Sequence, residues 1–348
     1  NYTLDANTSG DNNVAVGYGA LTGNTTGTRN IAIGVGALDA ADDENDNIAI
    51  GHDALGGAVA AGAANVAIGS YTLEGVTSAI ANVAIGFKAL QTNASSNSNT
   101  AIGYYASNLT TGAFNTSLGT LALQTNDGGT NNTALGNQTL QYLTSGTHNI
   151  AVGHAAGDLI TTGSGNTLLG WAADTSANNV NYETVIGYGA VGNGTNTVTL
   201  GNSSVTAIHA QVQTIIALSD VRAKREINDG KLGLDFINKL RTVTYKLKNP
   251  ADYPEEILER NFKKEIIERP KDNETVHNGL IAQEIKKVMD ELGIQWSGWS
   301  ENDSNGKQGI QYGALTVPLI KAVQEQQEMI DSLKKTIEDQ NKRFEKIE

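Results

Sequence analysis

The sequence contains no cysteine, and its first 218 residues contain almost no lysine or arginine. Without cysteine, a disulfide framework and thiolate metal sites are excluded. Residues 1–218 hold 13 acidic residues but only two basic ones, Arg29 and Lys88, and carry a formal charge of −11. Residues 219–348 hold 24 acidic and 22 basic residues and carry −2. Because nucleic-acid binding rests on clustered Lys and Arg, we expect no nucleic-acid partner.

Long hydrophobic runs are also absent. No stretch approaches the roughly 20 apolar residues that a helix needs to cross a bilayer, so the sequence predicts no membrane insertion. The sequence begins at Asn1, inside a repeat pattern, without Met and without a signal-like segment. We therefore expect it to be a fragment of a longer protein, with any targeting signal elsewhere.

A five-residue unit recurs through the first 200 residues: Asn, usually a β-branched residue, a small residue, an aliphatic residue and Gly. Successive copies lie 16 to 18 residues apart, before a last step of 14. A short and regular period of this kind is typical of a solenoid, in which each repeat adds one coil. Copies begin at Asn13, Asn30, Asn47, Asn65, Asn82, Asn99, Asn115, Asn132, Asn149 and Asn166, and degenerate copies end at Gly187, where Glu183 replaces Asn, and at Gly201.

Each unit predicts a short strand stacked in parallel on the next one. Ile31 and Ile33 alternate and share one strand face, and Gly34 permits the turn that ends the strand. A second apolar pair, such as Ala37-Leu38, predicts a second short element in each coil. The repeated Asn is expected to form a structural column of amides that bond backbone groups. Such a roll has a thin core, and association of several chains is the usual remedy.

The Asn-Ile-Ala-Ile-Gly units over residues 10–201 resemble the head repeats of trimeric autotransporter adhesins. The resemblance implies a left-handed parallel β-roll packed as a homotrimer. We assign residues 1–201 to this repeat shaft, closed by the alternating strand at 197–202. Residues 202–218, which are rich in β-forming residues, are assigned to a connector.

Two features of the array invite functional interpretations. The residue after the unit Gly is often aromatic, which suggests contacts with sugar rings of a host receptor, including a polysaccharide; a packing ladder between coils is the interpretation that we favour. These candidate receptor contacts are Tyr18, Phe87, Tyr104, Trp171 and Tyr188. The acidic run 42–46 lacks the glycine and spacing of a calcium loop, so we predict a solvated turn there, with no metal site and no cofactor.

The rest of the chain reads as an α+β domain. An amphipathic helical segment is predicted at 232–240, a strand at 241–247 and a helix that follows 279–284 and runs through Leu292. Residues 250–275 are charged and contain three prolines, which indicates a surface insertion. Residues 312–315 open the last helix.

From Thr316 onward the sequence keeps a heptad phase. The a and d positions predict a coiled coil over residues 316–348 that is compatible with three strands. The a positions are Thr316, Val323, Ile330, Ile337 and Phe344, and the d positions are Leu319, Gln326, Leu333, Gln340 and Ile347.

Several short motifs of the second half, together with the terminal coiled coil, resemble the C-terminal intramolecular chaperone of endosialidase-type phage tailspikes and tail fibres. The resemblance implies that residues 219–315 form a trimeric chaperone that templates folding of the preceding β-structure and then cuts itself off. It implies Ser219 as nucleophile, Lys224 as general base and a cut between Leu218 and Ser219. The motifs are Leu-Ser-Asp-x-Arg-x-Lys at 218–224, Leu-Asp-Phe-Ile-Asn-Lys-Leu-Arg at 234–241, Thr-Tyr at 244–245, Gly-Leu-Ile-Ala-Gln-Glu at 279–284 and Tyr-Gly-Ala-Leu at 312–315.

The residues alone leave two interpretations of this stretch. A hydroxyl becomes a nucleophile when a neutral lysine takes its proton, whereas Ser-Asp before a charged stretch is also a common helix N-cap. A spacing of five puts Ser219 and Lys224 on opposite faces of a strand, or about 140° apart on a helix, so the pair requires a turn between them.

At the level of the whole chain, self-processing as a single-turnover serine endopeptidase competes with a non-enzymatic trimeric surface adhesin whose C-terminal domain stays attached. A polysaccharide depolymerase is not supported, since we find no catalytic carboxylate pair in residues 1–218. We expect the protein in a virion tail fibre or at a cell surface, folded in the host cytoplasm if it is viral.

Overall fold

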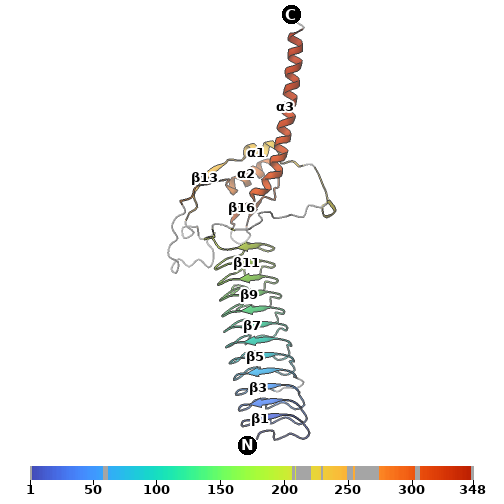
Figure 1. Cartoon of the computed structure of the whole chain (residues 1–348), viewed down its shortest axis with the longest axis vertical. Coiled ribbons are helices and arrows are strands. Elements are labelled where there is room, and N and C mark those ends of the chain that lie inside the picture. Colours follow the sequence, from blue (N-terminus) through green and yellow to red (C-terminus); the bar gives the residue numbers. More distant parts are fainter. Residues whose placement is uncertain are drawn as a thin grey trace. The chain divides into compact units, whose positions relative to one another are not determined.

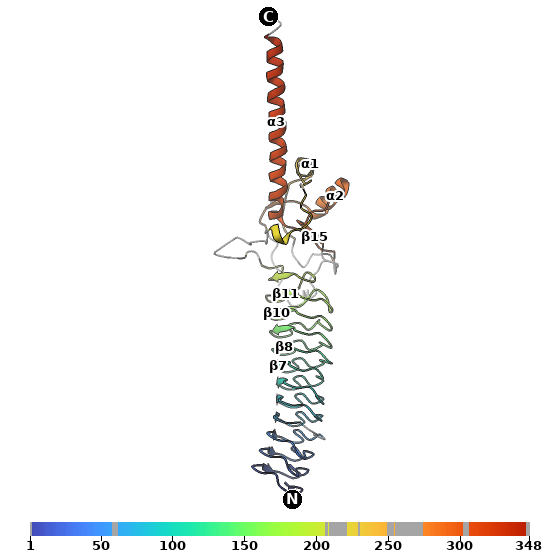
Figure 2. The ribbon, with the colours of Figure 1, turned by 90° about the vertical axis from the view of Figure 1, so that its right-hand side faces the viewer.

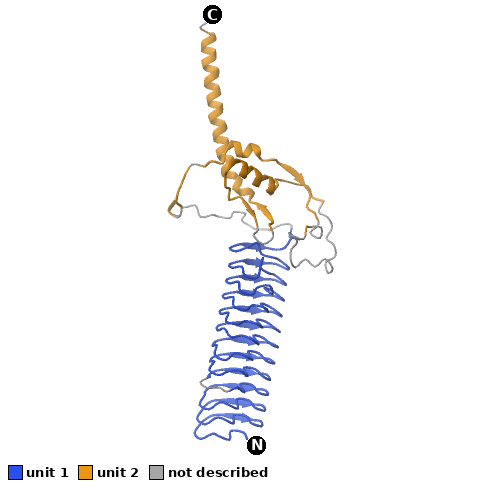
Figure 3. Cartoon of the chain, turned by 180° about the vertical axis from the view of Figure 1, so that it is seen from behind, with its two compact units in different colours: residues 1–206, 259–263 blue, residues 207–258, 264–348 orange. Residues whose placement is uncertain are grey.

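The computed structural model describes residues 2–57, 62–205, 208, 221–228, 230–248, 254, 274–301 and 306–345. These residues fall into two compact units (Figure 3). The first holds the described residues up to 205, which form the repeat array, and the second holds those from 208 onward.

The array is a parallel β-solenoid with one three-residue strand in each coil (Figures 1 and 2). The strands form a single 12-stranded sheet in sequence order, and equivalent residues pair, as in Val14 opposite Ile31. This confirms the predicted parallel stacking. The strands are β1 (Val14–Val16), β2 (Ile31–Ile33), β3 (Ile48–Ile50), β4 (Val66–Ile68), β5 (Val83–Ile85), β6 (Thr100–Ile102), β7 (Thr116–Leu118), β8 (Thr133–Leu135), β9 (Ile150–Val152), β10 (Thr167–Leu169), β11 (Thr184–Ile186) and β12 (Val198–Leu200).

The unit glycine ends each strand for a steric reason. Gly34 has a φ of 143°, a backbone conformation that residues with a side chain rarely adopt. A Cβ at this position would also collide with the backbone of Gly51 in the next coil. Glycine is therefore required both by the turn and by the close stacking of coils.

The strand face that points into the solenoid carries the small residues. Ala32 is fully buried, whereas Ile33 is 38% exposed and Val16 is 58% exposed. The aliphatic residues that share a strand face, as predicted, thus share the outer face. The interior is filled by the strand alanines and by the Ala-Leu pair of the following turn, such as Ala37 and Leu38.

That Ala-Leu pair does not form the second short element that the sequence predicts. The leucine has a left-handed backbone, with a φ of 51° at Leu38 and 50° at Leu90, so an extended segment cannot continue through it. The leucine side chain still enters the core from a turn. Most coils consequently contain one strand, with turns and bends making up the remainder. The last coils are an exception, because Asp174 and Val191, at the position of the leucine, form an isolated parallel bridge.

The repeated asparagine forms a buried column, as predicted. Asn99 accepts a hydrogen bond from the Asn115 backbone N–H at 2.9 Å and donates one to the Gly112 carbonyl at 2.9 Å. Equivalent bonds to the next coil's backbone N–H run from Asn13 up to Glu183. The column satisfies backbone groups that the strand ladder leaves unpaired, so its role is structural.

The second unit combines short helices, one long C-terminal helix and two small antiparallel sheets (Figure 1). The helical segments predicted before 241 and through Leu292 are confirmed, as is the last helix, and the strand predicted at 241–247 is present over 243–245. The strands at 277–279, 299–301 and 308–310 were not predicted. The elements are η1 (Val221–Ala223), α1 (Leu234–Lys239), β13 (Val243–Tyr245) paired antiparallel with β14 (His277–Gly279), α2 (Ala282–Leu292), β15 (Trp299–Glu301) paired antiparallel with β16 (Gln308–Ile310), η4 (Tyr312–Leu315) and α3 (Thr316–Phe344).

A small apolar core holds this unit together. Phe236 of α1 is 1% exposed and packs on Trp296, with ring centroids 5.6 Å apart. Ile285 and Met289 of α2 complete the cluster. The first turn of α1 meets α3 through the Leu234 backbone N–H, which donates to the Glu325 carboxylate at 2.7 Å.

Candidate functional site

The predicted cleavage site lies only in part within the described residues. Leu218 and Ser219 fall outside them, so the Ser–Lys pairing stays a prediction. Residues Val221–Ala223 form the 3₁₀ turn η1, closed by the Lys224 backbone N–H donating to the Val221 carbonyl at 3.1 Å. The described residues between positions 219 and 224 therefore form a turn. The Lys224 side chain is exposed.

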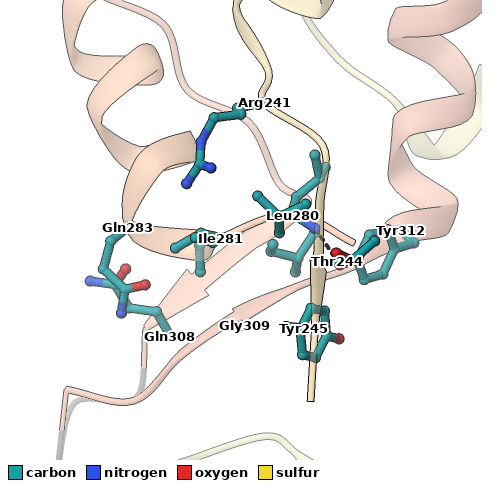
Figure 4. Close-up of a pocket in the computed structure, with 12 residues that line it drawn as sticks. Arg241, Thr244, Tyr245, Leu280, Ile281, Gln283, Gln308, Gly309 and Tyr312 are labelled. Atoms are coloured by element: carbon teal, nitrogen blue, oxygen red, sulfur yellow. Dashed lines mark hydrogen bonds between the residues drawn. The ribbon is translucent and has the colours of Figure 1, made fainter. Parts of the chain in front are cut away.

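Three motif-bearing segments of the second unit converge on one cavity. They are 241–245, 280–283 and 308–312, and the cavity has a volume of about 540 Å³ (Figure 4). Its lining consists of Arg241, Val243, Thr244, Tyr245, Leu280, Ile281, Ala282, Gln283, Gln308, Gly309, Ile310 and Tyr312.

A bidentate ion pair ties the segment before β13 to the first turn of α2. The Arg241 Nε donates to Glu284 Oε2 at 3.0 Å, and its Nη2 donates to the other carboxylate oxygen. The hydrogen bond to Arg241 holds the pKa of Glu284 below its usual value, and the same bond raises the pKa of Arg241. Both side chains are exposed, so the pair serves mainly to orient the two segments.

A second contact joins the Tyr-Gly-Ala-Leu motif to the Gly-Leu-Ile-Ala-Gln-Glu motif. The Leu280 backbone N–H donates to the Tyr312 hydroxyl at 2.9 Å, drawn as a dashed line in Figure 4. A Cβ on Gly279 would collide with that hydroxyl. Glycine at 279 is thus needed for Tyr312 to reach the backbone.

The cavity is suited to binding an apolar group with a few polar contacts. Val243, Leu280, Ile281 and Ile310 supply apolar surface, and the buried Oε1 of Gln308 has no hydrogen-bond partner in the described part of the chain. Among the described residues, the lining holds no histidine, lysine or carboxylate, and so no group that ordinarily titrates near neutral pH.

The motifs lie together in one α+β unit, and part of that unit matches a known family. Residues 219–294 match the family model described as chaperone of endosialidase. The match takes in positions 219 and 224, α1, the β13–β14 strand pair and α2. At the level of this family, the endosialidase-chaperone segment has a chaperone and trimerisation role. No curated protein and no solved structure gave a significant match to the chain.

The aromatic residues after the unit glycines pack on one another between coils. Trp171 and Tyr188 stack with centroids 4.7 Å apart, Phe87 and Tyr104 stack at 5.6 Å, and Tyr18 meets Tyr2 edge-on. These contacts are those of a packing ladder. Receptor contact by the same residues stays a prediction.

The acidic run is more ordered than the solvated turn predicted from its sequence. Glu44 is 3% exposed, and its carboxylate accepts the backbone N–H groups of Asp42 at 2.7 Å and Asp43 at 3.1 Å. Asp46 forms an ion pair with Arg29 at 2.6 Å. Among the residues that the structure describes, no group of three potential metal ligands occurs.

No helix in the described part of the chain is both long enough and apolar enough to cross a membrane.

Proposed function

We propose that the chain is part of a trimeric fibre whose C-terminal segment assists assembly and then releases itself by cleavage between Leu218 and Ser219. The observation that carries the proposal is the start of the family match at residue 219, the position after the proposed bond. The boundary also separates a repetitive array from a mixed α+β unit. Such an array fits a tail fibre or a cell-surface adhesin that binds a host receptor.

The outer faces of the array strands support assembly of several copies. Val16, Leu118 and Val198 are 58%, 48% and 68% exposed in a single chain. They lie on β1, β7 and β12 of one parallel sheet. The third strand position is aliphatic in every coil from Val16 to Leu200, so the outer face of the sheet carries a long apolar stripe. Exposed apolar stripes of this kind mark interaction sites. Another copy of the chain is a suitable partner, because its coils have the same spacing as the residues of the stripe.

Helix α3 supports the same assembly. Its 29 residues span about 44 Å, at 1.5 Å per residue. Val323, Ile330 and Leu333, all at a or d positions, are 62%, 45% and 63% exposed. A coiled coil of three chains would bury them.

In the proposed reaction, Lys224 is the general base and takes the hydroxyl proton of Ser219 while Ser219 Oγ attacks the Leu218 carbonyl carbon. The Leu218–Ser219 amide nitrogen leaves after receiving that proton, which gives an ester between the Leu218 acyl group and Ser219 Oγ. One water molecule then hydrolyses the ester and leaves a Leu218 carboxylate and a restored Ser219 hydroxyl. The nucleophile lies next to its target bond in sequence, which reduces the entropic cost of approach.

Denaturing electrophoresis and intact mass of the purified full chain test the cleavage. The native sequence should give fragments of residues 1–218 and 219–348, and Ser219→Ala or Lys224→Ala should give one intact chain. Lys231→Ala, at another exposed lysine of the same segment, is the matched control and should still be cut. Persistence of the cut in both dyad variants would exclude the assignment. A single intact band for the native sequence would favour the non-enzymatic adhesin.

Cleavage should depend on assembly, because the trimer orients the reacting groups. Replacing Ile330, an a-position residue of α3, by Asp should weaken the coiled coil and reduce cleavage together with trimer content. Mass photometry and electrophoresis on the same sample measure both. Full cleavage in a monomeric variant would contradict this coupling.

A further inference from the structure

The structure surrounds Lys88 with aromatic rings. Its ammonium nitrogen lies 5.7 Å from the Tyr71 ring centroid, 5.6 Å from that of Phe87 and 5.7 Å from that of Tyr105. These distances are in the range of cation–π attraction. They also fix the position of a side chain that would otherwise be highly variable on a solenoid surface.

This grouping arises because two residues after the unit glycine contribute side chains. Phe87 and Tyr104 follow Gly86 and Gly103 directly, whereas Tyr71, Lys88 and Tyr105 stand one residue later, in left-handed backbone with φ of 59°, 58° and 55°. Tyr71, Phe87, Lys88, Tyr104 and Tyr105 are called the Lys88 patch. Sequence reasoning missed Tyr71 and Tyr105 because it followed only the residue directly after glycine.

The Lys88 patch is broader than the other aromatic ladder of the array. Phe87 packs edge-on with Tyr71 at 5.8 Å, and Tyr104 meets Tyr105 at 4.5 Å, so rings from two adjacent columns adjoin. Phe87 and Tyr104 remain 36% and 53% exposed. In the ladder of Trp171 and Tyr188, by contrast, the position after each aromatic residue holds Ala172 or Gly189.

The charge of Lys88 distinguishes the patch further. The other basic residue of the array, Arg29, is paired with Asp46. In the described residues no carboxylate forms an ion pair with Lys88, although the array around it carries −11. A fixed cation without a carboxylate partner, set among exposed rings, is complementary to a ligand that combines one negative charge with apolar C–H surface.

We propose that the Lys88 patch binds a carboxylate-bearing sugar, a uronate or a sialate, within a larger saccharide. The ring edges and the exposed parts of Phe87 and Tyr104 contact the C–H face of the sugar, and the Lys88 ammonium pairs with its carboxylate. The negative array disfavours long polyanions, so the recognised element is one acidic residue. The inference extends the receptor-binding part of the proposed function and does not depend on cleavage.

The test uses the full chain on a printed panel of uronate- and sialate-containing oligosaccharides. Each saccharide is printed beside its carboxyl-reduced, neutral form. The native chain should bind at least one acidic saccharide about two- to fivefold more tightly than its reduced form, the ratio expected for one exposed ion pair. Lys88→Gln should abolish this ratio, Lys88→Arg should retain it, and Tyr104→Ala should weaken binding of both forms.

Trp171→Ala is the matched control in the other ladder and should leave binding unchanged. Acetylation of Lys88 in the assembled protein, followed by mass spectrometry, checks that no other copy covers the patch. Absence of a preference for any acidic saccharide, equal binding by Lys88→Gln, or protection of Lys88 from acetylation would each overturn the proposal. The cleavage pattern on a denaturing gel should be the same in all these variants, so failure here is distinct from failure of the proposed self-processing.

Discussion

Replacing Asn99 by Ala removes one member of the asparagine column and leaves two backbone groups without partners. These are the Asn115 N–H and the Gly112 carbonyl, each bonded to the Asn99 amide at 2.9 Å. Asn99 is 1% exposed, so water does not readily replace the amide. An unsatisfied buried polar group costs about 1–3 kcal/mol, which gives a total of roughly 2–4 kcal/mol if the coil relaxes slightly.

Native-state hydrogen exchange followed by mass spectrometry is the appropriate assay, because solenoid coils interact mainly with their neighbours and the loss should be local. A loss of about 2.8 kcal/mol corresponds to roughly 100-fold faster exchange. The acceleration should be greatest at Asn115 and should fade within two or three coils.

Asn137→Ala is the matched control. Its amide is exposed and donates to the Thr120 carbonyl at 3.4 Å, so the change should cost less than about 0.5 kcal/mol. Equal exchange rates in the Asn99 and Asn137 variants would refute the reasoning, since they would mean that the column does not satisfy otherwise unpaired backbone groups.

Two further changes test the array and the second unit. Burial raises the pKa of Asp174 well above its usual value, aided by a hydrogen bond with Asp158. The folded state therefore keeps a proton that the unfolded state loses, so the contribution of Asp174 to the free energy of unfolding should fall as pH rises above about 4. Asp174→Asn should flatten the pH dependence of thermal unfolding between pH 4 and 7. Phe236→Ala should destabilise the second unit by about 3–5 kcal/mol in urea unfolding, whereas Ile227→Ala, at a 65% exposed position, should not. A steeper pH profile for the Asn variant, or equal effects of Phe236→Ala and Ile227→Ala, would contradict these assignments.

The repetitive fold could be predicted because one local pattern recurs in phase. Asn, a central small residue and Gly each have a fixed role in a coil, and many copies confirm the same period. The pattern does not predict the backbone conformation of the turn that follows the glycine. The left-handed leucine of most coils, such as Leu38, is imposed by the need to bring its side chain inward from a turn. No local propensity signals it.

The second unit was predictable in its helices but less so in its sheets and cavity. The β15–β16 hairpin pairs Trp299 with Ile310, and neither three-residue strand has an alternating pattern, so the turn signal Asn305-Gly306 between them has no recognisable strands beside it. The cavity depends on bonds between residues far apart in sequence: 43 positions separate Arg241 from Glu284, and 32 separate Leu280 from Tyr312. Motif order identified these segments, but only tertiary structure brings them to one place.

The sequence pattern and the structure together explain which face of each array strand points outward. Alternation in Ile31-Ala32-Ile33 shows that the isoleucines share a face, but it does not indicate whether that face points into the coil or outward. A coil of about 17 residues encloses little volume, and in most coils the turn leucine already fills part of it, so a small residue usually occupies the inner strand position. Leu168 and Val185 are fully buried at that position, in coils whose turns hold Asp174 and Val191 in place of the leucine. The aliphatic residue at the third strand position lies on the outer face of each coil. Association of copies along that face would bury these residues.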